Sequence, residues 1–326
     1  PFVVAIAGNL VQSDATSDWS NGDRTYQLVG SAFYRDGYDF AGLYGVRRWQ
    51  TVGSDPSGLT GRFDLWILDA SAKTAQPHGP EGLFGFVGVE AAGILGTTTA
   101  IRTSPSYFQQ DVRTYGGLAR FGVVKQKKGR DDIEFGQVVV QLDAGWASND
   151  ADPYDGTVKQ FTSDPNAAPG LLLFPTVMHF LSARSATNAL DAQLAARPFP
   201  GVDFLASKGG FFGAEYLYPS IVVRPSSTFD VKAAMLIAVA TGDLVDPYTT
   251  VVSGSARGYR GASPTHHDLG IELDYGFEWR DKLSPAATLQ IGGQVGILFP
   301  GHALDDAKGV GLPVQSTGQV RVGIQF

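Results

Sequence analysis

Three aspartates that lie close together in the sequence form a candidate site for a metal ion. Asp150, Asp152 and Asp155 precede Gly156 in the stretch SNDADPYDG, and carboxylate oxygens are the ligands that Ca²⁺ prefers in proteins. The stretch lacks the ligand spacing and the distal glutamate of an EF-hand loop. A solvated acidic turn therefore explains these residues better than a calcium site, and we expect that the protein needs no cofactor.

Two adjacent histidines are the candidates for acid–base catalysis or for binding a transition metal. His266 and His267 precede Asp268 in the stretch THHDLG. Neighbouring side chains in a strand point to opposite faces, so this pair would make a poor chelate or catalytic dyad. Serine, histidine and acidic residues occur near other loops, but they form no local catalytic motif. We therefore expect that the protein is not an enzyme.

Many of the other charged residues alternate with apolar ones. In DLGIELDYGFEWR, residues 268–280, four carboxylates and an arginine alternate with large apolar side chains. This period of two is that of a β-strand with one polar and one apolar face. The polar face would be costly to bury in a soluble core, while the apolar face is too long to leave in water. One face therefore requires water and the other an apolar medium.

The same alternation recurs along the whole chain. Its runs are longer than the usual soluble strand of about five or six residues and close to the roughly nine to eleven residues that cross a bilayer as a tilted strand. We predict twelve strands, over residues 2–12, 25–35, 38–49, 62–72, 83–96, 112–125, 133–146, 213–224, 229–239, 268–280, 287–299 and 316–326.

The connections between these strands alternate between short turns and long polar loops. The long ones cover residues 13–24, 51–61, 97–111, 147–212, 242–267 and 300–315. Outer-membrane barrels have short periplasmic turns and long external loops, and an even number of strands leaves both chain ends on the short-turn side. Aromatic residues near strand ends suit the girdles at the two membrane interfaces, and they include Tyr34, Tyr38, Trp49, Trp146, Tyr218, Trp279 and Phe299.

These patterns predict an all-β fold, a transmembrane antiparallel up-and-down β-barrel of about twelve strands. It would form a single domain over residues 1–326 with a long inserted loop at 147–212, and it would have 14 or more strands if others precede Pro1. A soluble sandwich, whose second sheet covers the apolar face, is the alternative. The longest apolar stretch without charge, residues 165–183, is broken by Pro169 and Pro175, so we predict no membrane-spanning helix.

The final strand, STGQVRVGIQF, alternates up to the terminal Phe326. An even-stranded pattern with this ending resembles the bacterial outer-membrane β-barrels. The stretches DLGIELDYGFEWRDKLSPAATLQIGGQVGILFPGHALDD and SDPNAAPGLLLF are similar to porin-like barrels of the alginate-exporter kind. The resemblance implies an integral protein of the Gram-negative outer membrane, with membrane lipid around it and Phe326 as the signal for the barrel-assembly machinery.

Composition restricts the partners. The chain of 326 residues has a formal net charge of −7 and no basic cluster beyond residues 125–130, so we expect no nucleic-acid partner. It has no cysteine, which excludes disulfides and cysteine-bound metal through this chain and fits several compartments.

If lipid meets the apolar face of the strands, the side chains on the opposite face line a lumen. That predicted inward set is Arg47, Arg62, Asp64, Glu90, Arg120, Asp143, Asp230, Lys232, Glu272, Asp274, Glu278, Arg280 and Arg321, with the phase around Asp143 ambiguous because of the run QVVVQ. A barrel of about twelve strands would be narrow.

The expected function is a porin-like channel for passive passage of small polar or charged solutes. The alternative is a scaffolding barrel that anchors other envelope proteins through its external loops. Within the loop at 147–212, apolar residues at helical spacing over 175–197 predict a helix. This loop would constrict the lumen, cap its mouth or pack outside the rim.

Overall fold

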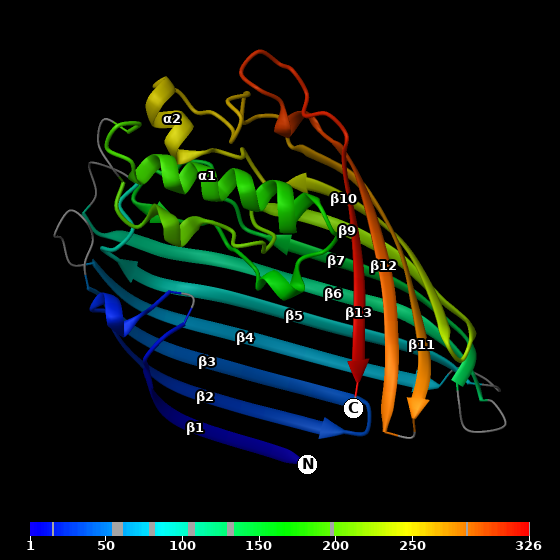
Figure 1. The fold of residues 1–326 in the computed structure, drawn as a ribbon. Helices are drawn as coiled ribbons and strands as arrows, with labels where there is room; N and C mark the ends of the chain where they lie inside the picture. Colours follow the sequence, from blue (N-terminus) through cyan, green and yellow to red (C-terminus); the bar gives the residue numbers. More distant parts are fainter. Residues whose placement is uncertain are drawn as a thin grey trace.

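The computed structural model describes residues 1–14, 16–53, 61–77, 82–103, 108–128, 134–195, 199–284 and 286–325. These residues form an all-β structure in which each strand of one sheet pairs antiparallel with the next (Figure 1). The strands on this path are β1 (Phe2–Val11), β2 (Arg24–Asp36), β3 (Asp39–Val52), β4 (Gly61–Pro77), β5 (Leu83–Thr98), β6 (Gln110–Lys128), β7 (Glu134–Ala147), β9 (Ala214–Ser226), β10 (Phe229–Ala240), β11 (Asp268–Ser284), β12 (Ala287–Pro300) and β13 (Gln315–Gln325). The short β8 (Thr157–Val158) pairs parallel with β6.

The sheet is bent into a trough, and its two end strands are not paired with each other. The path of paired strands in the described residues begins at β1 and ends at β13. The up-and-down antiparallel arrangement predicted from the sequence is therefore present, whereas the predicted closure into a ring is not observed. Both chain ends lie toward the end of the strands that carries the short turns (Figure 1).

The two faces of the sheet differ in the way that the alternating sequence predicted. On β11, Glu272 is fully buried while Tyr275 and Phe277 are about half exposed. The register pairs Glu272 with Leu236 of β10 and with Leu298 of β12, so these residues share one face. We call this the inner face, and the face that carries Tyr275 and Phe277 the outer face.

A long insert between β7 and β9, residues 148–213, covers part of the inner face. It contains β8, the 3-10 turns η2 (Pro165–Ala167) and η4 (Val202–Leu205), the π-helix η3 (Leu173–Met178) and α1 (His179–Leu190). Leu173, Phe174 and Met178 are fully buried and form one hydrophobic core with inner-face residues such as Leu236 and Leu298. The other long loops contain η1 (Trp19–Asn21), α2 (Pro247–Ser253) and η5 (His302–Leu304).

The predicted helix in the insert exists, but it is shorter, and its fully buried positions are not its large apolar residues. α1 ends at Leu190, where Asp191 takes an extended conformation. The large apolar residues Phe180 and Leu190 are exposed, with Leu194 beyond the helix. The buried positions of α1 carry small side chains, namely Ser182, Ser185, Ala186 and Ala189. Close packing of α1 against its neighbours requires small residues there, a demand that apolar spacing alone does not reveal.

Within the described residues, none of the helices has the length and apolar character needed to cross a membrane.

Candidate functional site

A cavity of about 540 Å³ lies between the insert and the inner face of the sheet. Residues 166–171 of the insert form one side of it. The remaining lining comes mainly from inner-face residues of β6, β7 and β9 to β13, and its polar members include Arg120, Gln141, Asp143, Tyr218, Asp230, Lys232, Asp274, Glu278, Gln294, Gln319 and Arg321. This collection of polar groups makes the cavity the candidate functional site.

A chain of ion pairs crosses the inner face from β9 to β13. The carboxylate of Asp230 on β10 accepts hydrogen bonds from Arg224 Nε at 2.7 Å and from Arg280. Arg280 also donates to Glu278 Oε1 at 2.8 Å, and Glu278 Oε2 accepts from Arg321 at 3.0 Å. The residues meet because the register pairs Asp230 with Glu278 and Arg321 with Gly292, which itself pairs with Glu278.

Two further groups of charged residues line the same cavity. Arg120 on β6 binds Asp143 on β7 with two hydrogen bonds, of 2.8 and 2.9 Å. Asp274 on β11 accepts a hydrogen bond of 2.9 Å from Tyr218 Oη, and the ammonium group of Lys232 lies over the Tyr218 ring at 5.3 Å. Tyr218 therefore belongs to the polar network of the inner face, and its predicted place in an outer aromatic girdle is wrong.

In two of these pairs the base is far more exposed than the acid that holds it. The Arg120 side chain is 53% exposed against 15% for Asp143, and Arg321 is 71% exposed against 27% for Glu278. The acids are recessed against the wall, where they accept bonds from neighbouring strands. At these two pairs the group that is exposed to a solute is a guanidinium, which is a hydrogen-bond donor.

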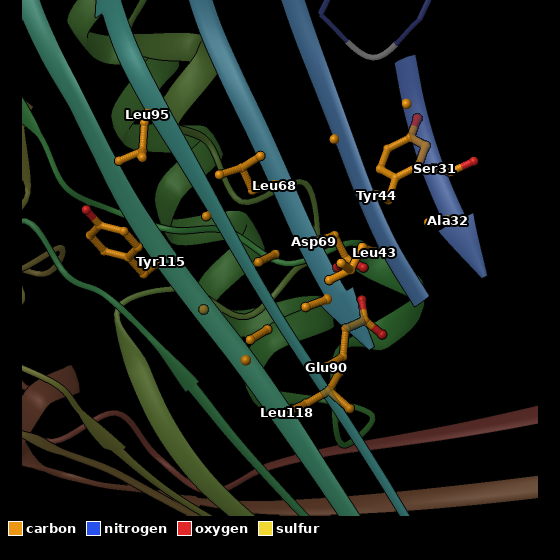
Figure 2. A pocket seen from close by; sticks show the side chains of 18 of the residues that line it. Ser31, Ala32, Leu43, Tyr44, Leu68, Asp69, Glu90, Leu95, Tyr115 and Leu118 are labelled. Carbon is orange, nitrogen blue, oxygen red and sulfur yellow. The ribbon is translucent and has the colours of Figure 1, made fainter. Parts of the chain in front are cut away.

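On the first half of the sheet, an acidic pair shares the inner face. Asp69 of β4 and Glu90 of β5 are diagonal neighbours, because the register pairs Asp69 with Ala92 and Glu90 with Ser71. Both residues border a second hollow, of about 1230 Å³, over strands β1 to β7 (Figure 2). Most of its lining is apolar and belongs to the outer face, as Leu68, Leu95 and Tyr115 do, so it offers few polar groups for chemistry.

The structure places most of the predicted inward residues on the inner face. These are Glu90, Arg120, Asp143, Asp230, Lys232, Glu272, Asp274, Glu278, Arg280 and Arg321. All of them except Glu90 and Glu272 take part in the ion-pair and hydrogen-bond networks around the cavity. Their role in lining a pore stays a prediction.

Three residues of the predicted set, Arg47, Arg62 and Asp64, lie on the outer face instead. Arg47 pairs in register with Trp66, forms an ion pair with Asp64 and stacks over the rings of Trp49 and Trp66. Arg62 lies on the same face of β4 as Asp64. The sequence has two adjacent arginines here, so polar alternation could not decide which one points inward.

Of the two adjacent arginines on β3, Arg48 is the one that points inward. It is 8% exposed and donates to Asp14 Oδ2 at 2.8 Å and to the side chain of Gln50. Sequence reasoning also missed Asp69, because the alternation in β4 is weak, and Arg224, because a bulge near Phe229 shifts the register of β9 and β10.

The acidic stretch considered for calcium does not form a common site. Asp155 pairs with Lys159, the carboxylate of Asp152 accepts from the Tyr154 N–H, and Asp150 accepts from the Lys159 N–H. Burial raises the pKa of Asp150 to about 6. Across the described part of the chain, no group of three or more histidine or acidic side chains could hold a metal ion.

The two histidines considered for catalysis also separate. His267 pairs with Asp243 at 3.0 Å, whereas the ring of His266 lies 5.9 Å from that of His302. The predicted assembly signal, Phe326, lies outside the described residues.

A comparison with models of known protein families gives no match, and a comparison with curated protein sequences gives none either.

Proposed function

We propose that the protein is a transmembrane β-barrel of a Gram-negative outer membrane and a narrow channel for passive passage of small polar or charged solutes. The observation that carries this proposal is the contrast between the two faces of one sheet. Each strand from β1 to β7 and from β9 to β13 has exposed large apolar side chains on its outer face. The inner face carries the ion pairs and the cavity.

An apolar surface of this extent favours lipid as its surroundings. Soluble monomers rarely expose contiguous apolar patches larger than a few hundred Å². All the described strands belong to a single sheet, so the second sheet that a soluble sandwich needs is not found among the described residues. A lipid-facing outer surface and a wet inner surface are the arrangement of outer-membrane barrels.

The spacing of aromatic residues on the outer face supports the same interpretation. Tyr26 and Tyr34 lie on the outer face of β2, near its two ends. At about 3.4 Å per residue they are roughly 27 Å apart along the strand. With a tilt of about 40°, this spans roughly 20 Å of membrane depth, close to the apolar band of about 25 Å between aromatic girdles.

The seam between β1 and β13 would have to close in a membrane. Unpaired backbone N–H and C=O groups cost several kcal/mol each in hydrocarbon, so open sheet edges do not occur there. β1 runs away from the short-turn end and β13 runs toward it (Figure 1). They can therefore pair antiparallel directly or through an even number of additional strands.

One observation favours the scaffold as a second candidate. Exposed apolar side chains gather on the helices above the sheet, including Phe180 at 66% exposure and Val252 at 60%. Such residues could contact another envelope protein.

Conductance separates the two candidates. The purified protein should give discrete single-channel steps in planar lipid bilayers if it is a channel. A protein that inserts, as shown by protection from protease in vesicles, but remains silent across a range of voltages would reject the channel and favour the scaffold.

A further inference from the structure

One carboxylate of the wall holds the insert in place. Glu272 on β11 is fully buried, and its Oε1 accepts hydrogen bonds from the N–H groups of Leu171 and Leu172, at 2.5 and 2.8 Å. Its Oε2 accepts a third, of 2.7 Å, from Leu173. Hydrogen bonds to an ionised acceptor are the stronger kind. Glu272 therefore forms the most concentrated polar contact between the sheet and the insert.

The three donors belong to the start of a helical segment. η3 begins at Leu173 and continues directly into α1. The first N–H groups of a helix have no partner within the helix, and they favour a negative charge nearby. No side chain of the insert caps this start. Glu272 supplies the cap from a strand that lies about one hundred residues further along the chain.

Both partners are shaped for this close approach. Gly170 has a φ of +78°, and a Cβ at this position would lie 3.0 Å from both carboxylate oxygens of Glu272. On β12, a Cβ at Gly296 would lie 3.2 Å from Leu171 Cβ. The segment Gly170–Leu173 can approach the wall this closely because both glycines lack a side chain.

The same segment borders the cavity. Residues 166–171 line it on one side, and Arg120 of β6 and Arg321 of β13 line it from other parts of the wall. The position of this segment consequently determines how much of the lumen remains open.

We propose that Glu272 is the positioning residue of a constriction. This inference depends on the proposed channel function: the carboxylate fixes the segment Gly170–Leu173 against β11, and loss of this contact lets the segment leave the wall and widens the lumen. The requirement is for a carboxylate, because two oxygens with negative charge must accept three N–H groups.

The first test is the conductance of Glu272→Ala in planar bilayers. We expect larger and less regular steps than in the wild-type protein. Adding formate should restore the smaller steps, because a small carboxylate can enter the vacated space, while chloride at equal ionic strength should not. Asp281→Ala is the control: Asp281 is an exposed carboxylate on the same strand that does not border the cavity, so its conductance steps should match those of the wild-type protein.

Hydrogen exchange tests the contact without reference to conduction. The amides of Leu171 to Leu173 should exchange about 100-fold faster in Glu272→Ala, the effect of losing one to two charged hydrogen bonds, and formate should slow them again. Glu272→Gln, which keeps the shape but offers one acceptor oxygen, should be intermediate and serves if the alanine variant does not fold.

Unchanged exchange at these three amides, or faster exchange that formate does not slow, would overturn the role of Glu272. A silent wild-type protein would instead reject the proposed channel, and hydrogen exchange would still decide whether Glu272 holds the segment. Faster exchange without any change in the conductance steps would show that the segment is held by Glu272 but does not constrict the lumen.

Discussion

At the scale of single residues, most of the charges that line the cavity on β6, β7 and β9 to β13 are arranged as ion pairs. Asp230 and Glu278 each accept from two arginines, and Arg280 donates to both. Charges that are partly removed from water are costly unless they are paired. The paired acids satisfy this requirement, and the guanidinium groups of Arg120 and Arg321 remain largely exposed.

The direction of each side chain predicts how a new charge is tolerated. Leu273 lies on the outer face near the middle of β11, so Leu273→Arg should destabilise the protein in membranes by about 2 to 4 kcal/mol. Gln294 is exposed on the inner face of β12, so Gln294→Arg should be tolerated. Refolding titrations into lipid vesicles measure both, and equal costs would show that the assigned faces are wrong.

A buried carboxyl in the insert predicts a pH dependence. Burial is the main reason that the pKa of Asp150 is raised from 3.8 to about 6. A carboxyl whose pKa is higher in the folded than in the unfolded state adds to the free energy of unfolding below pH 4. This contribution is lost as the pH rises through 6. We expect the insert to open more readily at pH 7.5 than at pH 4, with a difference on the order of 2 kcal/mol.

Asp150→Asn should reduce this difference, because an amide does not titrate. Limited proteolysis of the insert at the two pH values measures it. Asp152→Asn is the control, since Asp152 is exposed and its replacement should leave the pH difference intact. A wild-type insert whose stability rises with pH would contradict the assignment.

Residue orientation could be predicted where the alternation was strict. On β11 to β13, polar and apolar residues alternate with few exceptions, and the structure separates them as predicted. At Arg47 and Arg48 two charges are adjacent, so the phase depends on which one finds a partner in the loop at Asp14. Tyr218 was misplaced because a tyrosine suits either an interface or a buried hydrogen bond.

At the scale of elements, strands were predicted better than their contacts. Strand length and the alternation of short and long connections are local properties of the sequence, and the paired strands follow them closely. The buried face of α1 depends on what packs against it. The cap of η3 depends on Glu272, a residue on another element, so no local signal in the insert could have indicated it.

Removing the insert tests whether it restricts conduction through the lumen. Deleting residues 149–205 and joining the ends with a short Gly/Ser linker should raise single-channel conductance, because the segment that borders the cavity is lost. The sheet should still assemble, since the antiparallel pairing of its strands does not involve the insert. Circular dichroism in detergent checks assembly. Normal assembly with unchanged conductance would assign the insert to partner binding.

At the scale of the whole molecule, the medium around the sheet decides whether the protein can work as a membrane channel. The outer face carries exposed large apolar side chains on every strand of the path, with Arg47, Arg62 and Asp64 as charged exceptions, and the inner face carries the ion pairs around the cavity. The seam between β1 and β13 must close if lipid surrounds the protein. Closure could not be derived from alternation, because the pattern along each strand carries no information on which strands form the ends.

The most direct test uses the absence of native cysteine. Single cysteines at successive positions 271–278 of β11 can each carry a spin label in the protein reconstituted in vesicles. The account predicts alternation with a period of two: odd positions accessible to oxygen dissolved in lipid, even positions accessible to a water-soluble nickel reagent or, where the insert packs, to neither. Labels at the odd positions that are accessible only to the water-soluble reagent would contradict the claim that the outer face meets lipid.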